Sequence, residues 1–219
     1  KMVQECLSYR FVAEEKDLGV LFTQDLKPGR QCMAAAAKAN RIIGLVRRNF
    51  RDLDKRDFLL IYKAYIRPHL EYCIQAWSPY LEKDMEVLER VQRSATRLLS
   101  GFARYGYEDR LRKLGITTLR KRRERGDLIE VYRIMSGREK IEKTQFFRPA
   151  NNEYCLRGHS LKIRKERSRL DIRKHSFSQR VVGSWNRLPQ KVVDAQSINQ
   201  FKNLLDRHWQ DMDATGYTA

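Results

Sequence analysis

The chain has 219 residues, of which 45 are Lys or Arg and 27 are Asp or Glu, so its formal net charge is +18. A charge of this size attracts polyanions, and nucleic acid is the leading partner that it indicates. Hydrophobic residues make up 42% of the chain, which is enough for a buried core and excludes disorder throughout. The chain contains no apolar run of about 20 residues that could span a bilayer.

The cysteines indicate a reducing compartment. Cys6, Cys32, Cys73 and Cys155 lie far apart in the sequence and form no C-x-x-C pair. This usage favours free thiols over a disulfide framework. The first residues also lack the pattern of a secretion signal. We therefore expect an intracellular protein, located in the nucleus, the cytoplasm or both.

The first predicted element is a β-hairpin. Between residues 8 and 22, apolar residues alternate on both sides of Glu14-Glu15, which predicts two strands joined by a polar turn at these acidic residues. Lys27-Pro28-Gly29 then breaks the chain. We assign residues 1–26 to this hairpin region.

Three helices are predicted next. Apolar residues recur at helical spacing over residues 31–50, 58–66 and 83–100. Pro68 disfavours the α conformation of the residue before it, so the second helix is expected to end there, followed by an aromatic-rich connector over residues 72–80. Gly101 is the expected left-handed cap of the third helix, whose polar face consists of Glu89, Arg90, Gln92, Arg93 and Arg97.

The remaining elements are also helical. A short helix over residues 107–114 is interrupted by Gly115, and Thr118 can cap a long helix that continues to about residue 135. Pro189 ends a helix around Trp185, and a capping box over residues 197–200 begins the last one. The sequence thus predicts a mainly α fold, divided into the hairpin (1–26), a helical bundle (27–136), a linker (137–161), a second small basic helical region (162–210) and a frayed tail (211–219).

Candidate catalytic and metal-binding groups are few. A two-metal polymerase needs carboxylates that converge on Mg²⁺, usually as an Asp-Asp pair, and the chain has no such dipeptide. His69, His159, His175 and His208 lie in unrelated surroundings, so no hydrolytic triad is indicated. Cys155 and His159 are spaced as two zinc ligands with His175 as a third, but a fourth is lacking. We expect neither catalysis nor a bound metal from this chain alone.

Basic residues form two clusters, which we interpret as candidate nucleic-acid-binding residues. The first covers little more than one helical turn and cannot pair fully with the nearby acids; it consists of Arg120, Lys121, Arg122, Arg123 and Arg125. The second consists of Arg157, Lys162, Arg164, Lys165, Arg167, Arg169, Arg173 and Lys174. Arginine predominates, which suits bidentate contact with phosphate. Solvated surface charge is the alternative reading for any one of these residues.

Three motifs occur in a fixed order: Arg67-Pro68-His69-Leu70-Glu71-Tyr72-Cys73-Ile74-Gln75-Ala76-Trp77-Ser78-Pro79-Tyr80, Arg125-Gly126-Asp127-Leu128-Ile129-Glu130-Val131-Tyr132 and Arg157-Gly158-His159-Ser160-Leu161-Lys162. Together they resemble the region after the palm in reverse transcriptases of LINE-type (non-LTR) retrotransposons, especially the jockey-like and chicken-repeat branches. The resemblance covers about residues 16–209. It implies a primer-grip hairpin at Leu18, Gly19 and Val20, a helical thumb and a basic C-terminal region.

The function implied by the resemblance is RNA-directed DNA synthesis. Mg²⁺ and nucleotides would be bound by a palm with paired aspartates, which would precede Lys1. On this reading, the chain is a C-terminal fragment that binds the RNA template and DNA primer without carrying the catalytic carboxylates. Two alternatives stay open: a host-retained RNA- or DNA-binding module derived from the element, and a scaffold whose basic faces bind acidic proteins.

Overall fold

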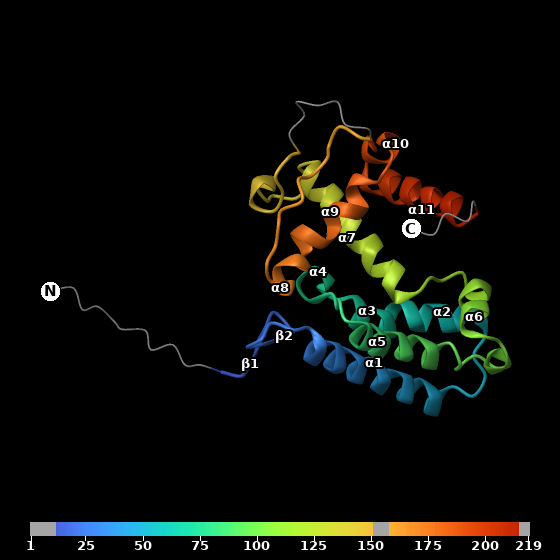
Figure 1. Cartoon of the computed structure of the whole chain (residues 1–219). Helices are drawn as coiled ribbons and strands as arrows, with labels where there is room; N and C mark the ends of the chain where they lie inside the picture. Colours follow the sequence, from blue (N-terminus) through green and yellow to red (C-terminus); the bar gives the residue numbers. More distant parts are fainter. Residues whose placement is uncertain (1–11, 151–157, 215–219) are drawn as a thin grey trace. The chain divides into compact units, whose positions relative to one another are not determined.

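The computed structural model describes residues 12–150 and 158–214, which form a mainly helical fold with one two-stranded antiparallel hairpin (Figure 1). This confirms the predicted fold class. The chain divides into two compact units, one of residues 1–73 and 77–115 and the other of residues 74–76 and 116–219. The division after Gly115 differs from the predicted boundary within residues 137–161.

The first unit consists of a hairpin followed by helices. Its elements are β1 (Glu14–Asp17), β2 (Val20–Thr23), α1 (Gly29–Asn49), α2 (Lys55–Ile61), the π-helical turn η1 (Tyr62–Ile66), α3 (Arg67–Glu71), α5 (Glu82–Ala95), the 3-10 turn η2 (Phe102–Arg104) and α6 (Tyr107–Leu114). Helix α1 packs against α3 and α5, and its small buried residues, among them Ala35 and Ala39, let these helices approach closely. Helix α5 ends earlier than predicted, and Gly101, although left-handed with φ 74°, precedes η2.

The hairpin turns at Leu18 and Gly19. Both residues have positive φ, 44° and 86°, as a type I′ turn requires at its two central positions. Glu14 and Glu15 lie in β1, opposite Thr23 and Phe22. The predicted turn at Glu14-Glu15 is therefore wrong, because Gly19 is the residue that adopts a positive φ at little cost.

The helical segment continues through Pro68, so the prediction that it ends there is wrong. Arg67 is α-helical, with φ −60° and ψ −38°, and its N–H donates to the carbonyl of Tyr62, five residues earlier. This wider turn lies directly before the proline, which has no N–H to donate to the helical ladder. Buried Tyr62, Ile66 and Leu70 anchor the segment in the core. Their burial overrides the local preference of Arg67 for an extended conformation.

Two residues that were expected on the polar face of α5 are buried. The Tyr62 hydroxyl donates to Gln92 Oε1, Gln92 Nε2 donates to the Tyr107 hydroxyl at 3.0 Å, and that hydroxyl donates to the Glu89 carboxylate. Burial, reinforced by the hydrogen bond to Glu89, raises the pKa of Tyr107, which keeps its proton. The network satisfies its polar groups, so these side chains can lie in the core.

The second unit is a helical bundle. Its helices are α7 (Leu119–Met135), α8 (Asp171–Lys174), α9 (Phe177–Asn186), α10 (Gln190–Val193) and α11 (Ile198–Ala214), with a 3-10 turn, η3 (Lys143–Gln145), and the first three residues of α4 (Ile74–Trp77). The predicted caps are confirmed, since Thr118 Oγ1 accepts from Lys121 N at 3.3 Å and Ser197 Oγ accepts from Gln200 N at 3.1 Å. Residues 211–214 are helical, contrary to the predicted fraying; residues 215–219 lie outside the described residues.

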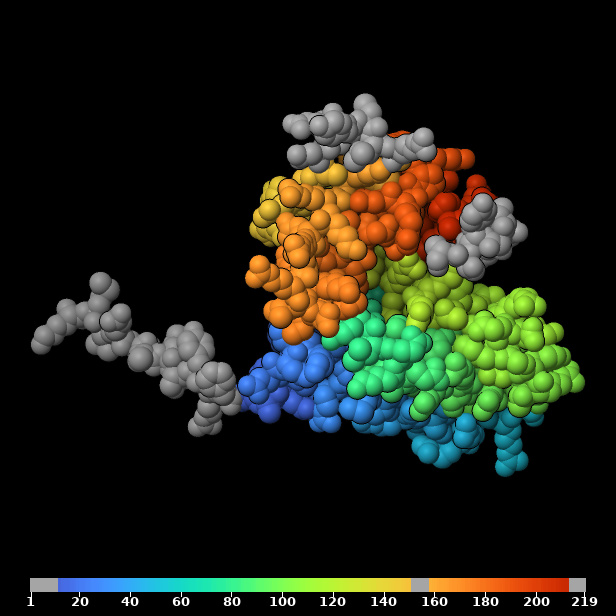
Figure 2. All heavy atoms as spheres, viewed as in Figure 1, coloured from blue at the N-terminus to red at the C-terminus, as the bar shows by residue number. Residues whose placement is uncertain are grey.

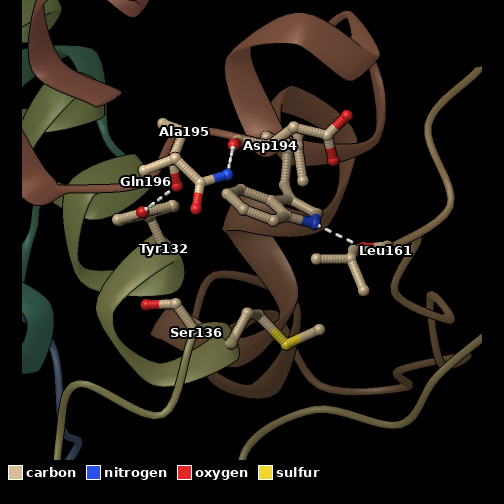
Figure 3. A pocket seen from close by; sticks show the side chains of 9 residues that line it. Tyr132, Ser136, Leu161, Asp194, Ala195 and Gln196 are labelled. Atoms are coloured by element: carbon tan, nitrogen blue, oxygen red, sulfur yellow. Dashed lines mark hydrogen bonds between the residues drawn. The ribbon is translucent and has the colours of Figure 1, made fainter. Parts of the chain in front are cut away.

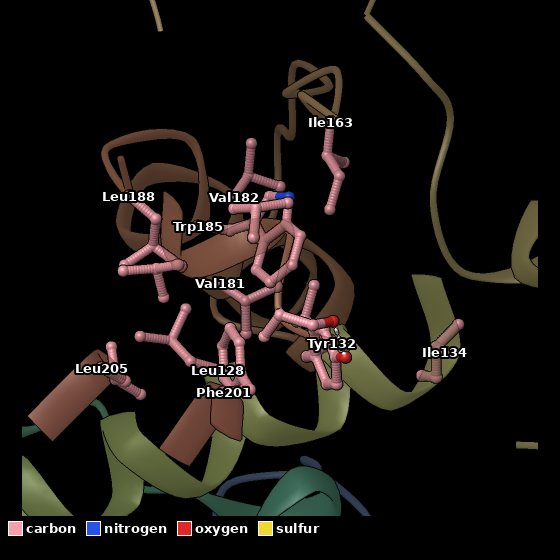
Figure 4. Packing of buried hydrophobic residues seen from close by; sticks show 14 of the residues in the cluster. Leu128, Tyr132, Ile134, Ile163, Val181, Val182, Trp185, Leu188, Phe201 and Leu205 are labelled. Carbon is pink, nitrogen blue, oxygen red and sulfur yellow. Dashed lines mark hydrogen bonds between the residues drawn. The ribbon is translucent and has the colours of Figure 1, made fainter. Parts of the chain in front are cut away.

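Helices α7, α9 and α11 enclose the core of the second unit (Figure 4). Trp185 and Phe201 are fully buried, and the rings of Tyr132 and Phe201 stack with centroids 4.3 Å apart. Phe147 and His159 are buried as well, although both fall in the predicted linker. Residues 137–150 and 158–161 therefore belong to the folded unit, and the linker prediction is wrong for them. Among the described residues, no helix is long and apolar enough to cross a membrane.

Candidate nucleic-acid interface

The second basic cluster lies on an extended segment held against α9. We call residues 162–174 the basic strap; it has no helix before α8. The Asn186 side chain binds both backbone groups of Ile163. Its Oδ1 accepts from Ile163 N at 2.9 Å, and its Nδ2 donates to Ile163 O at 2.7 Å. Gln179 Oε1 accepts from Glu166 N at 3.1 Å. Side-chain amides of α9 thus hold the strap backbone at Ile163 and Glu166, in place of the hydrogen bonds that a neighbouring β-strand would make.

A second set of contacts holds the beginning of the strap. Pro149 and Ile163 form an isolated antiparallel bridge, in which Arg164 N donates to Arg148 O at 2.8 Å. The Ile163 side chain is buried in the core of the unit. Just before the strap, Trp185 Nε1 donates to Leu161 O at 2.8 Å. Because the Ile163 side chain is buried, this side of the strap faces the core of the unit.

The basic side chains of the strap point outward. The exposed ones are Arg164, Lys165, Arg167, Arg169, Arg173 and Lys174, whereas Lys162 is half-buried. In Figure 2 the orange atoms, which belong to this part of the chain, form part of the visible surface of the second unit. Arg157, the remaining member of the predicted cluster, lies outside the described residues.

Most of this charge is not neutralised locally. Glu166 forms ion pairs with Arg148 at 3.2 Å and with Arg173 at 3.7 Å. No ion pair found among the described residues involves Arg164, Lys165, Arg167 or Arg169. These four cations are therefore available to an anion from solution, on a segment whose backbone is held at Ile163 and Glu166.

The first basic cluster, on α7, is only partly exposed. Arg120 is exposed, Lys121 lies 5.6 Å from the Trp209 ring centroid and Arg122 is half-buried. Arg123 is only 3% exposed, and Arg125 forms a bidentate ion pair with Asp206, with both N···O distances at 2.7 Å. We therefore correct the interpretation of Arg123 and Arg125, whose side chains are used inside the unit.

The Arg125-Gly126-Asp127 motif connects elements of the second unit. Arg125 joins α7 to α11 through Asp206. A Cβ on Gly126 would lie 2.9 Å from Ile74 Cδ1, so the missing side chain lets residues 74–76 approach α7. Asp127 joins α7 to α9 through Arg180. The motif is explained by packing within the unit.

Arg180 is the centre of this connection and was not identified from the sequence. Its Nε and Nη2 donate to the two carboxylate oxygens of Asp127 at 2.8 and 3.0 Å, and Nη2 also donates to Ile74 O at 3.1 Å. Burial raises the pKa of the Asp127 carboxyl, and the Arg180 guanidinium opposes that rise. Only a fold that brings residues 74, 127 and 180 together reveals the contact.

His159 is a core residue. Its Nε2 lies 2.9 Å from the carbonyl oxygen of Trp185, which requires the proton on Nε2, and its ring packs edge-on against Trp185. Burial lowers the pKa of His159. Cys155, which the sequence spaces as a possible second zinc ligand, lies outside the described residues. In residues 12–150 and 158–214, no group of three or more potential ligand side chains is arranged to hold a metal ion.

The primer-grip-like residues lie at the hairpin tip of the first unit. Leu18 is 82% exposed, whereas Val20 is buried. The Tyr72 hydroxyl donates to Leu18 O at 2.8 Å, and a Cβ on Gly19 would lie 3.6 Å from Tyr72 Cε1. Tyr72 thus supports the turn from outside the hairpin, and the Leu18 side chain projects into solvent.

The second unit also contains a pocket of about 450 Å³ (Figure 3). Its polar lining is largely satisfied internally, since the Tyr132 hydroxyl donates to Ala195 O and Gln196 Nε2 donates to Asp194 O at 2.9 Å. The charged side chain in its lining is the Asp194 carboxylate. A phosphate would meet repulsion there, so the basic strap is the better candidate interface.

No protein-family model, no curated protein and no solved structure matches this chain.

Proposed function

We propose that this chain binds nucleic acid through the basic strap, as the C-terminal template- and primer-binding part of a LINE-type reverse transcriptase. The observation that carries the proposal is the set of four exposed cations, Arg164, Lys165, Arg167 and Arg169, on a backbone held by α9. The assignment to this class of polymerase rests on the three sequence motifs.

The held backbone of the strap lowers the entropic cost of binding. A strap whose backbone is already fixed loses little conformational freedom when its side chains meet phosphates. Three of the four cations are arginines, which contact phosphate oxygens with two parallel hydrogen bonds. Because phosphate contacts carry no sequence information, the binding is independent of base sequence.

The hairpin supports the more specific part of the proposal. A primer end in this class of enzyme would meet the tip formed by Leu18 and Gly19, and that tip is exposed and held by Tyr72. The implied Mg²⁺ belongs to the palm of the parent enzyme. The described residues bring together no carboxylate cluster that fits it, and we derive no step through the metal.

The test is a titration of a labelled RNA–DNA hybrid at several salt concentrations. With about five phosphate contacts on a duplex, the logarithm of the affinity should fall with log salt at a slope of about −4 to −5. The double substitution Arg164→Gln/Arg169→Gln should reduce that slope by about 2. A matched control, Lys140→Gln/Arg207→Gln, removes the same charge from exposed positions outside the strap.

Two results would contradict the proposal. One is an unchanged slope for the strap variant, and the other is an equal loss in the control, which would indicate a diffuse effect of net charge. Binding to acidic proteins that survives nuclease treatment, together with no measurable affinity for the hybrid, would instead favour the scaffold function.

A further inference from the structure

Three exposed, uncharged rings follow one another along a helical segment of the first unit. We define the aromatic stripe as Tyr65 in η1, His69 in α3 and Tyr72, the residue that caps the end of α3. Tyr65 is 62% and Tyr72 is 55% exposed, His69 is exposed, and the neighbouring exposed positions are Ala64 and Pro68. In a chain in which 33% of the residues are charged, no exposed charged residue lies between Tyr65 and Tyr72.

The stripe is continuous because the helical segment continues through Pro68. Tyr65 and His69 lie four residues apart on this helical segment, which turns them toward the same side, and Tyr72 follows where the segment ends. The opposite side carries Ile66 and Leu70, which are buried. Had the helix ended at Pro68, Tyr65 and His69 would not have shared a face.

The hairpin extends the stripe at one end. Tyr72 donates its hydroxyl proton to Leu18 O, so the exposed Leu18 side chain lies at the same end as the Tyr72 ring. Lys16 and Lys63, which precede Leu18 and Tyr65 by two residues in the sequence, are exposed and add to the positive charge of the first unit.

We propose that the aromatic stripe stacks unpaired bases of single-stranded nucleic acid. Every base offers a π face to an aromatic ring, so such stacking tolerates any sequence. The net charge of +18 attracts the strand to the chain. A second copy of the chain is disfavoured as the occupant, because each copy carries a net charge of +18. The stripe lies in the first unit, and its role is separate from that of the basic strap.

The test compares Tyr65→Ala with Tyr65→Phe, which keeps the ring. Tyr65→Ala should lower the affinity for a short oligothymidylate about fivefold or more, while the affinity for a hairpin duplex of the same length stays unchanged. Tyr65→Phe should bind both like the wild type. Arg164→Gln/Arg169→Gln should weaken both ligands, so a failure of the strap and a failure of the stripe give different patterns.

Photo-crosslinking provides a second measurement that does not depend on the stability of a variant. A single strand containing 5-iodouracil should form adducts on Tyr65, His69 or Tyr72, located by mass spectrometry of the digested protein. Adducts confined to other residues would overturn the proposal, as would an unchanged single-strand affinity in Tyr65→Ala. A dimer seen by sedimentation that Tyr65→Ala disperses would assign the stripe to self-association instead.

Discussion

Removal of Arg180 should destabilise the second unit more than removal of any exposed arginine. Arg180 pairs with both carboxylate oxygens of Asp127, whose side chain is only 9% exposed. The substitution Arg180→Gln leaves that carboxylate buried without its partner, which costs about 3 to 5 kcal/mol. Arg148→Gln is the matched control, because Arg148 pairs with Glu166 but its side chain is 72% exposed. We expect the control to cost less than about 1 kcal/mol.

A double-substitution cycle separates the ion pair from the other contacts of Arg180. Asp127→Asn/Arg180→Gln removes both charges and should cost less than the sum of the single substitutions by about 1 to 3 kcal/mol. The residual cost reports the hydrogen bonds from Arg180 to backbone carbonyls such as Ile74 O. Additive effects would mean that the two charges do not interact.

The assay is native-state hydrogen exchange of amides in α7 and α9. It measures the opening free energy of this region directly, which matters because a chain of two compact units need not unfold in a single step. If Arg180→Gln lowers this free energy no more than Arg148→Gln does, the inferred role of Arg180 is refuted.

Three further predictions concern other positions. Burial lowers the pKa of His159, so the unfolded state binds more protons than the folded state. The free energy of unfolding should therefore fall as the pH drops below about 6.5. Denaturation of His159→Gln should show a weaker pH dependence, and identical pH profiles for the variant and the wild type would refute this. Gly19 has φ 86°, so Gly19→Val should lower the opening free energy of the hairpin by about 1 to 2 kcal/mol, measured by amide exchange in β2. Gly19→Asn should lower it less, and equal costs for the two substitutions would contradict the turn geometry. Arg125→Gln should cost only about 1 kcal/mol in the same exchange assay, because the Asp206 side chain is 43% exposed, and a cost as large as that of Arg180→Gln would count against this ranking.

The sequence predicted the elements whose ends depend on local chemistry. Thr118 and Ser197 provide side-chain oxygens for the first turns of α7 and α11, and Gly115 ends α6 in the left-handed conformation. Such caps act within a few residues of the chain, so the pattern alone identifies them. The mainly α fold was predictable for the same reason.

Features that depend on distant contacts were missed. Pro68 remains helical because Tyr62, Ile66 and Leu70 are buried in the core, and no local rule includes that burial. Gln92 occurs in a polar-looking position of α5, yet it bonds to hydroxyls from two other elements. In both places, tertiary packing outweighs local preference.

In the candidate site, too, local features were predicted and features that depend on distant contacts were missed. Composition identified the basic residues of the strap, and the structure places six of them at the surface. Composition could not distinguish them from Arg123 and Arg125, because their burial and pairing depend on where α7 packs and on Asp206, far along the chain. The hydrogen bonds from Asn186 that fix the strap had no visible signal in the sequence either.

NMR spectroscopy of the arginine side chains tests the central claim most directly, because it shows which guanidinium groups meet the nucleic acid. On addition of an RNA–DNA hybrid, the Nε–Hε signals of Arg164, Arg167 and Arg169 should shift, and a hybrid of unrelated sequence should shift the same signals. The signals of Arg125 and Arg180, which are engaged with Asp206 and Asp127, should stay in place. Saturable binding that leaves all three strap signals unchanged would contradict the account.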